Sequence, residues 1–66
     1  MEYRIIEVLA NELLCENIED EKKLYLSRHN FYTKDLDKIE VGKIIQVNTI
    51  SIDNKMKSKY IVVGIE

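Results

Sequence analysis

The stretch Lys43-Ile-Ile-Gln-Val-Asn-Thr-Ile-Ser-Ile52 decides the fold class of this chain. It follows Gly42 directly and is dominated by β-branched residues, so it predicts a β-strand. A second stretch, Tyr60-Ile-Val-Val-Gly-Ile65, has the same character and predicts another strand. Between them, Asp53-Asn54-Lys55 has the composition of a turn, because Asn tolerates the left-handed backbone. The carboxyl-terminal third is therefore expected to be β-structure.

The first half of the chain predicts a further hairpin. Leu14–Ile18 and Lys23–Leu26 are apolar stretches that flank the charged run Glu19–Lys22, which suits the tip of a hairpin. The segment Tyr3–Leu14 fits two structures, a strand or a helix with apolar residues three and four apart. We favour the strand, turning at Ala10-Asn11, because the β-branched residues of this segment lie close together.

Residues 33–40 have the pattern of a short helical turn. Thr33 is a suitable capping residue, and Leu36 and Ile39 are three residues apart. Five strands with one such turn before the fourth predict a mostly β fold, a small five-stranded barrel of the OB or SH3-like kind. No linker, repeat or low-complexity tract divides the sequence, so residues 1–66 are expected to form a single small β-barrel domain.

Length, charge and composition exclude several classes of function. The 66 residues are too few for a two-lobed enzyme, and a net charge of −2 provides no global attraction to nucleic acid or anionic membranes. Charged residues interrupt every apolar stretch, and a signal peptide is not evident. A single cysteine forms no internal disulfide, so a cytoplasmic location is expected. Ile, Lys and Asn make up about a third of the chain, a bias typical of AT-rich bacteria and their phages.

The order of the predicted elements resembles a known family. A charged hairpin, a third strand, a helical turn, Val41-Gly-Lys-Ile-Ile45 and Ile50-Ser-Ile-Asp53 are similar to a bacterial family of small β-barrel domains of unknown function. The resemblance covers residues 3–53. The chain departs from the family in lacking a proline near Ser27–Asn30 and in ending with Tyr60–Ile65 instead of an acidic helical tail. The resemblance implies a fold and no particular activity.

Ser27–Tyr32 is the densest polar and aromatic segment. As a recognition loop it would use a cationic side chain for phosphate or carboxylate, an aromatic face for stacking and an amide for reading an edge. In the alternative, Phe31 or Tyr32 fills the bottom of the barrel while its polar neighbours are solvated. The candidate binding residues of this segment are Arg28, His29, Asn30, Phe31 and Tyr32.

A basic segment near the carboxyl terminus forms the best cationic patch of the chain. Lysines alternate along it before an aromatic residue, so a strand here could follow a nucleic-acid backbone while Tyr3, Tyr25 or Tyr60 stacks on a base. The alternative is an edge strand in which lysines prevent aggregation. The candidate binding residues are Lys55, Lys57, Lys59 and Tyr60.

The predicted hairpin tip in the first half is acidic. Such a tip is normally solvated, but it could also dock against a basic surface of a partner. The candidate partner-binding residues are Glu16, Glu19, Asp20 and Glu21.

Catalysis and metal binding find little support in the sequence. The single histidine, His29, has no Cys or His at zinc-ligand spacing, and Asp35, Asp37 and Glu40 lack the pattern of a calcium loop. Cys15 lies among apolar residues, where a buried, inert thiol is expected. We therefore expect no enzyme activity, no metal site and no cofactor.

Two functions from different classes remain. The first is a non-catalytic interaction module, a bacterial or phage accessory or regulatory protein that binds a protein partner through its acidic first half and an exposed sheet edge. The alternative is a single-stranded nucleic-acid-binding OB-like domain, whose affinity would fall steeply with salt. A homodimer formed by edge pairing is a third possibility, and no membrane partner is expected.

Overall fold

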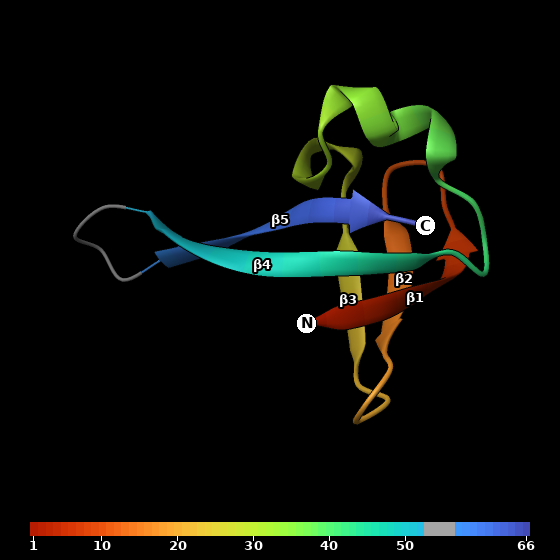
Figure 1. The fold of residues 1–66 in the computed structure, drawn as a ribbon, viewed down its shortest axis with the longest axis horizontal. Helices are drawn as coiled ribbons and strands as arrows, with labels where there is room; N and C mark the ends of the chain where they lie inside the picture. The colour runs from red at the N-terminus through yellow and green to blue at the C-terminus, as the bar shows by residue number, and fades with distance from the viewer. Residues whose placement is uncertain (53–56) are drawn as a thin grey trace.

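The chain folds into one antiparallel sheet (Figure 1). The computed structural model describes the backbone of residues 1–52 and 57–66, and the side chains of residues 1–50 and 59–66. The described residues contain five strands, as predicted, and residues 3–14 form a strand to Val8, a turn and the start of the next strand at Leu13, not a helix. The strands are β1 Glu2–Val8, β2 Leu13–Asn17, β3 Lys23–Leu26, β4 Ile44–Ile52 and β5 Lys57–Ile65. The predicted turn at residues 53–55 lies outside the described residues.

The sheet is continuous but not closed. Its order is β3-β2-β1-β4-β5, with every neighbouring pair antiparallel. In the described part of the chain, the two ends of this sheet are joined by one isolated parallel bridge, Phe31 to Val62. In Figure 1, β2 and β3 cross behind β4 and β5 at a steep inclination, so the sheet curves around its inner face.

Two β-bulges set which side chains face that inner side. The register of β1 against β2 shifts between Ile5 and Glu7, and the register of β4 against β5 shifts between Gln46 and Val47. The second bulge inserts Val63, so that Val62 and Ile65, three residues apart, both pack into the core. A bulge also increases the local twist of its strand, which favours the curvature of the sheet.

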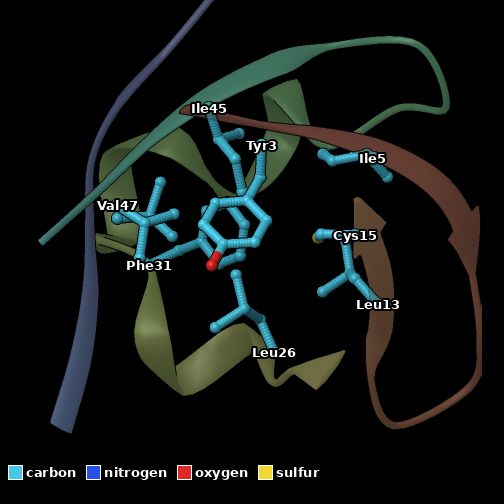
Figure 2. Packing of buried hydrophobic residues seen from close by; sticks show 9 residues of the cluster. Tyr3, Ile5, Leu13, Cys15, Leu26, Phe31, Ile45 and Val47 are labelled. Atoms are coloured by element: carbon cyan, nitrogen blue, oxygen red, sulfur yellow. The ribbon is translucent and has the colours of Figure 1, made fainter. Parts of the chain in front are cut away.

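The core fills the inner face of the curved sheet (Figure 2). The ring of Tyr3 lies at its centre, with Leu26, Ile45 and Val47 among the side chains around it. Tyr3 is 7% exposed, and the aliphatic members are almost fully buried. This burial is the main source of stability for the fold. The core consists of Tyr3, Ile5, Leu13, Cys15, Leu26, Phe31, Ile45, Val47 and Val62.

Two 3-10 helical segments, where one helical turn was predicted, connect β3 to β4. They are η1 Arg28–Asn30 and η2 Thr33–Lys38. The prediction that Thr33 caps the helical turn is wrong, because Tyr32 occupies the N-cap position of η2 and forms no side-chain capping bond. Gly42, with φ of +95°, provides the left-handed backbone that turns the chain into β4.

Candidate functional site

The segment Ser27–Tyr32 is largely part of the fold. Its first turn is a capping box: Ser27 Oγ accepts from His29 N at 3.1 Å, and Asn30 Oδ1 accepts from Ser27 N at 2.8 Å. Asn30 Nδ2 donates to the carbonyl oxygen of Tyr60 at 2.9 Å, which ties η1 to β5. Both ends of the Asn30 amide are therefore engaged in holding the chain together.

Arg28 reaches across to the turn between β1 and β2. Its Nη1 donates to Ala10 O at 3.0 Å and to Leu9 O at 3.4 Å, and its Nη2 donates to Leu9 O at 3.4 Å. These bonds satisfy carbonyl oxygens that β1 leaves unpaired at its end. A phosphate or carboxylate ligand would have to compete with these two carbonyls for the guanidinium.

The aromatic residues of the segment are divided between core and surface. Phe31 is 7% exposed and fills the core, so its ring offers no stacking face to a ligand. Tyr32 is 44% exposed, and His29 is also exposed. The structure thus agrees with the alternative prediction, in which an aromatic residue of this segment fills the interior. It differs from that prediction at Arg28, which is hydrogen-bonded to the backbone of the β1–β2 turn and not simply solvated.

The basic segment lies on an arm that extends from the sheet. The arm consists of residues 48–52 of β4 and 57–59 of β5, and Figure 1 shows it projecting beyond the other strands. Lys59 is exposed on it, opposite Ile50. Tyr60, at its base, is half-buried against the core. The side chain of Lys57 and all of Lys55 lie outside what the structure describes.

Three of the four acidic candidates, Glu19, Asp20 and Glu21, lie together at the turn between β2 and β3. This acidic turn, residues 17–22, is ordered by Asn17: its Oδ1 accepts from Glu19 N at 2.8 Å and from Asp20 N at 3.3 Å. Asp20 Oδ1 accepts from Lys22 N at 3.0 Å, and Glu21 has a positive φ of 61°. The side chains of Glu19, Asp20 and Glu21 are all exposed.

Glu16 stands apart from the other three acidic candidates. It lies on β2 and accepts a hydrogen bond at 2.8 Å from Lys23 Nζ on β3. This bond, with the nearby charges of Glu16 and Glu21, raises the pKa of the Lys23 ammonium. Glu16 is thus neutralised locally, and the free negative charge of the region lies at Glu19–Glu21.

A buried carboxylate that the sequence did not single out as such is found in η2. Asp35 is 2% exposed, and its Oδ1 lies 3.3 Å from Lys38 Nζ and 3.8 Å from Lys34 Nζ. Both lysines are exposed, so the pair of cations covers the carboxylate from the solvent side. The negative charge of Asp35 is therefore paired with two lysines of its own 3-10 segment.

Neither a metal-binding cluster nor a small-molecule pocket is found among the described residues. No three His, Cys, Asp or Glu residues among them are grouped to hold a metal ion, and the described surface has no pocket for a small molecule. Cys15 is fully buried as expected, and burial raises the pKa of its thiol to about 11. No helix in this part of the chain has the length and apolar character needed to cross a membrane.

Two of the three candidate surfaces present exposed charged side chains among the described residues. They are the acidic turn, with Glu19, Asp20 and Glu21, and the arm, with Lys59. The third, Ser27–Tyr32, mostly holds the fold together. A comparison of the chain with protein-family models, with curated proteins and with solved structures gives no match.

Proposed function

We propose that this protein is a non-catalytic interaction module that binds a protein partner through the acidic turn. The proposal rests on the observation that hydrogen bonds within the turn hold its backbone in one conformation. Asn17 Oδ1 and Asp20 Oδ1 together accept three backbone N–H groups, and two backbone bonds, Asn17 N to Lys22 O and Glu21 N to Asn17 O, complete it. Because the turn is already ordered, a partner binds it without the cost of fixing a flexible loop.

The charge of the acidic turn indicates the kind of partner surface. Neither Glu19 nor Glu21 has a side-chain hydrogen bond or ion pair within the described residues, so both carboxylates are free for a partner. Carboxylates presented in this way are complementary to a basic patch, and complementary charge increases both the association rate and the specificity. A basic protein surface is therefore the expected binding partner.

The free edge of β3 lies beside the acidic turn and extends the contact surface. Asn17 N donates to Lys22 O, so the backbone groups of Lys22 face β2. Along an antiparallel strand these groups point alternately to the two sides, so the N–H and C=O groups of Lys23 and Tyr25 point away from β2. No strand of the described chain pairs with that edge. Tyr25, 56% exposed, adds an aromatic contact of the type common at protein interfaces. An extended segment of the partner would pair here by strand addition.

We also propose that the open sheet is an OB/SH3-like barrel in which η1 takes the place of a closing strand ladder. The bridge from Phe31 to Val62 and the bond from Asn30 Nδ2 to Tyr60 O support this, because both join the segment of η1, which follows β3, to β5. The bacterial family of small barrels that the sequence resembles supports the same arrangement. On composition and the single cysteine, we place the protein in the cytoplasm of a bacterium or of a phage-infected cell.

The experiment is a pull-down from a bacterial lysate with two variants matched in charge. Glu19→Lys/Glu21→Lys reverses the acidic turn, while Asp37→Lys/Glu40→Lys makes the same charge change at exposed residues elsewhere. We expect a protein that is captured by the wild type and the control but not by the turn variant. After purification of that protein, its affinity for the turn variant should be at least about tenfold weaker. Equal capture by all three forms would contradict the proposal.

The second candidate function is binding of single-stranded nucleic acid. The observation that favours it is the arm, which projects from the sheet and exposes Lys59. A single-stranded RNA titrated at about 50 and 200 mM salt should then lose affinity steeply with salt, and Lys59→Glu should weaken binding more than Lys22→Glu. The burial of Phe31 and the bonds of Arg28 remove two of the groups that this function would use, so we rank it second.

A further inference from the structure

The outer edge of β4 is free along the arm. β1 pairs with β4 only from Glu2 opposite Gln46 to Arg4 opposite Ile44, and Met1 continues the pairing through Val47. Beyond Val47, β4 runs on through Asn48–Ile52 with β5 as its one strand neighbour among the described residues. Figure 1 shows this part of β4 extending past the amino terminus of the chain.

The backbone of this edge is arranged to accept another strand. Met1 N donates to Val47 O at 3.0 Å, and Val47 N donates to Met1 O at 2.7 Å, so the N–H and C=O groups of Val47 point away from β5. In a strand every second residue points the same way, which directs the groups of Thr49 and Ser51 toward the same free side. Four backbone hydrogen-bonding groups therefore lack a strand partner in the described chain.

This edge differs in charge from the other free edges of the sheet. β3 carries Lys23 and β5 carries Lys57 and Lys59, whereas Ile44–Ile52 contains no charged residue. Charged side chains on an edge strand prevent pairing with an identical strand, because like charges would lie opposite each other. The β4 edge has no such protection, and its Ile50 is 45% exposed.

We propose that the β4 edge pairs antiparallel with the β4 edge of a second copy of this chain. A two-fold axis at Ile50 would place Ile50 opposite its symmetry mate and Thr49 opposite Ser51 of the other copy. Each Thr49–Ser51 pair then exchanges two backbone hydrogen bonds, which satisfies all the free groups of both edges. An uncharged edge suits an identical partner better than it suits the basic partner expected at the acidic turn.

Pairing also explains how an arm of two strands is stabilised. An isolated two-stranded ribbon is marginally stable in water, while three or more strands are sufficient. Two arms joined through β4 form a four-stranded sheet whose outer strands are both β5, with Lys59 exposed on each. Those lysines oppose addition of a further copy, so the assembly ends at two chains.

The small area of contact sets the strength of the dimer. Met1 occupies the β4 edge up to Val47, so the pairing is limited to the five residues 48–52 on each chain. Such a contact buries less than the roughly 1,200 Å² of a stable interface, so the dimer should form only in the range of about 10 µM to 1 mM.

The experiment is sedimentation velocity of the full chain from 10 µM to 2 mM, after nuclease treatment. We expect a rise from the monomer mass of 7.8 kDa toward twice that value with increasing concentration. Ile50→Lys should remain monomeric, because it places two cations opposite each other at the axis. The control Val41→Lys introduces the same charge at an apolar residue that is 58% exposed and outside the strands, and it should dimerise like the wild type.

Two further measurements make the test decisive. An amide correlation spectrum of Ile50→Lys at low concentration shows whether the variant is folded, and a mixed ¹⁵N/¹³C-labelled sample of the wild type reports contacts between the two chains. A folded, monomeric Ile50→Lys and intermolecular contacts between residues 49 and 51 would support the dimer. A monomer at 2 mM, a dimer that Ile50→Lys leaves unchanged, or open-ended oligomers would overturn it. Binding of RNA at the arm with no self-association would also overturn it.

Discussion

Asn30 Nδ2 donates a 2.9 Å hydrogen bond to the backbone carbonyl of Tyr60, a residue thirty positions later in the chain. The same side chain accepts from Ser27 N through Oδ1. One amide thus caps η1 and fastens it to β5, at the place where the two ends of the sheet meet. In the described chain, the one backbone bridge at this place joins Phe31, which follows η1, to Val62 of β5.

Replacement of Asn30 should destabilise the protein. Asn30→Asp keeps the acceptor for Ser27 N but loses the donor to Tyr60 O, so we expect a loss of about 1–2 kcal/mol in the free energy of unfolding. Asn30→Ala, which also removes the cap, should lose more. Urea denaturation measures the free energy of unfolding of both Asn30 variants. The control is His29→Ala, which changes an exposed neighbouring residue. An Asp variant as stable as the wild type would show that the bond to Tyr60 contributes nothing.

The two glycines should respond differently to alanine. Gly42 has φ of +95° with no atom within 4 Å of an added Cβ, so Gly42→Ala is strained by its backbone alone and should cost about 1–2 kcal/mol. At Gly64 an added Cβ meets Gln46 Cβ and Cγ at 3.7 Å, which is ordinary contact, and Gly64→Ala should stay within about 0.5 kcal/mol of the wild type. Thermal or urea unfolding of the two alanine variants measures their stabilities. An equal loss of stability in both variants would contradict this prediction.

Cys15 should make the stability fall at alkaline pH. Burial raises the pKa of its thiol from 9.0 to about 11, so above pH 9 the unfolded chain loses the proton while the folded chain keeps it. The stabilisation is complete below pH 9 and decreases as the pH rises toward 11, by about 3 kcal/mol in total. Urea midpoints at pH 8 and pH 10.5, compared with those of Cys15→Ala, isolate this contribution. A difference between the two proteins that does not change with pH would be the contrary result.

The strands could be predicted from the sequence because their signals are local. Lys43–Ile52 and Tyr60–Ile65 are dense in β-branched residues, and the structure places β4 and β5 there. β5 begins earlier than predicted, at Lys57, because pairing with Ile52 extends it through a polar segment. The bulge at Val63 was not predicted, since it depends on the register with β4.

The site was less predictable than the strands, because the partners of its residues are distant in the chain. Arg28 contacts carbonyls of Leu9 and Ala10, which the folding of β1 onto β2 brings within reach, and nothing near Arg28 in the sequence indicates this. The capping box has a local signal in the sequence, Ser27 followed three residues later by Asn30. The acidic turn was located correctly, since a run of charges between two apolar stretches marks a hairpin tip without reference to the rest of the fold.

The distribution of the core along the chain has a consequence for synthesis. Tyr3 and Ile5 are synthesised long before Ile45, Val47 and Val62, which pack with them in one core. The first three strands therefore cannot bury their inner face until β4 and β5 have been made. A chain stopped before β5 is expected to remain sensitive to protease, because the residues that complete its interior are still missing.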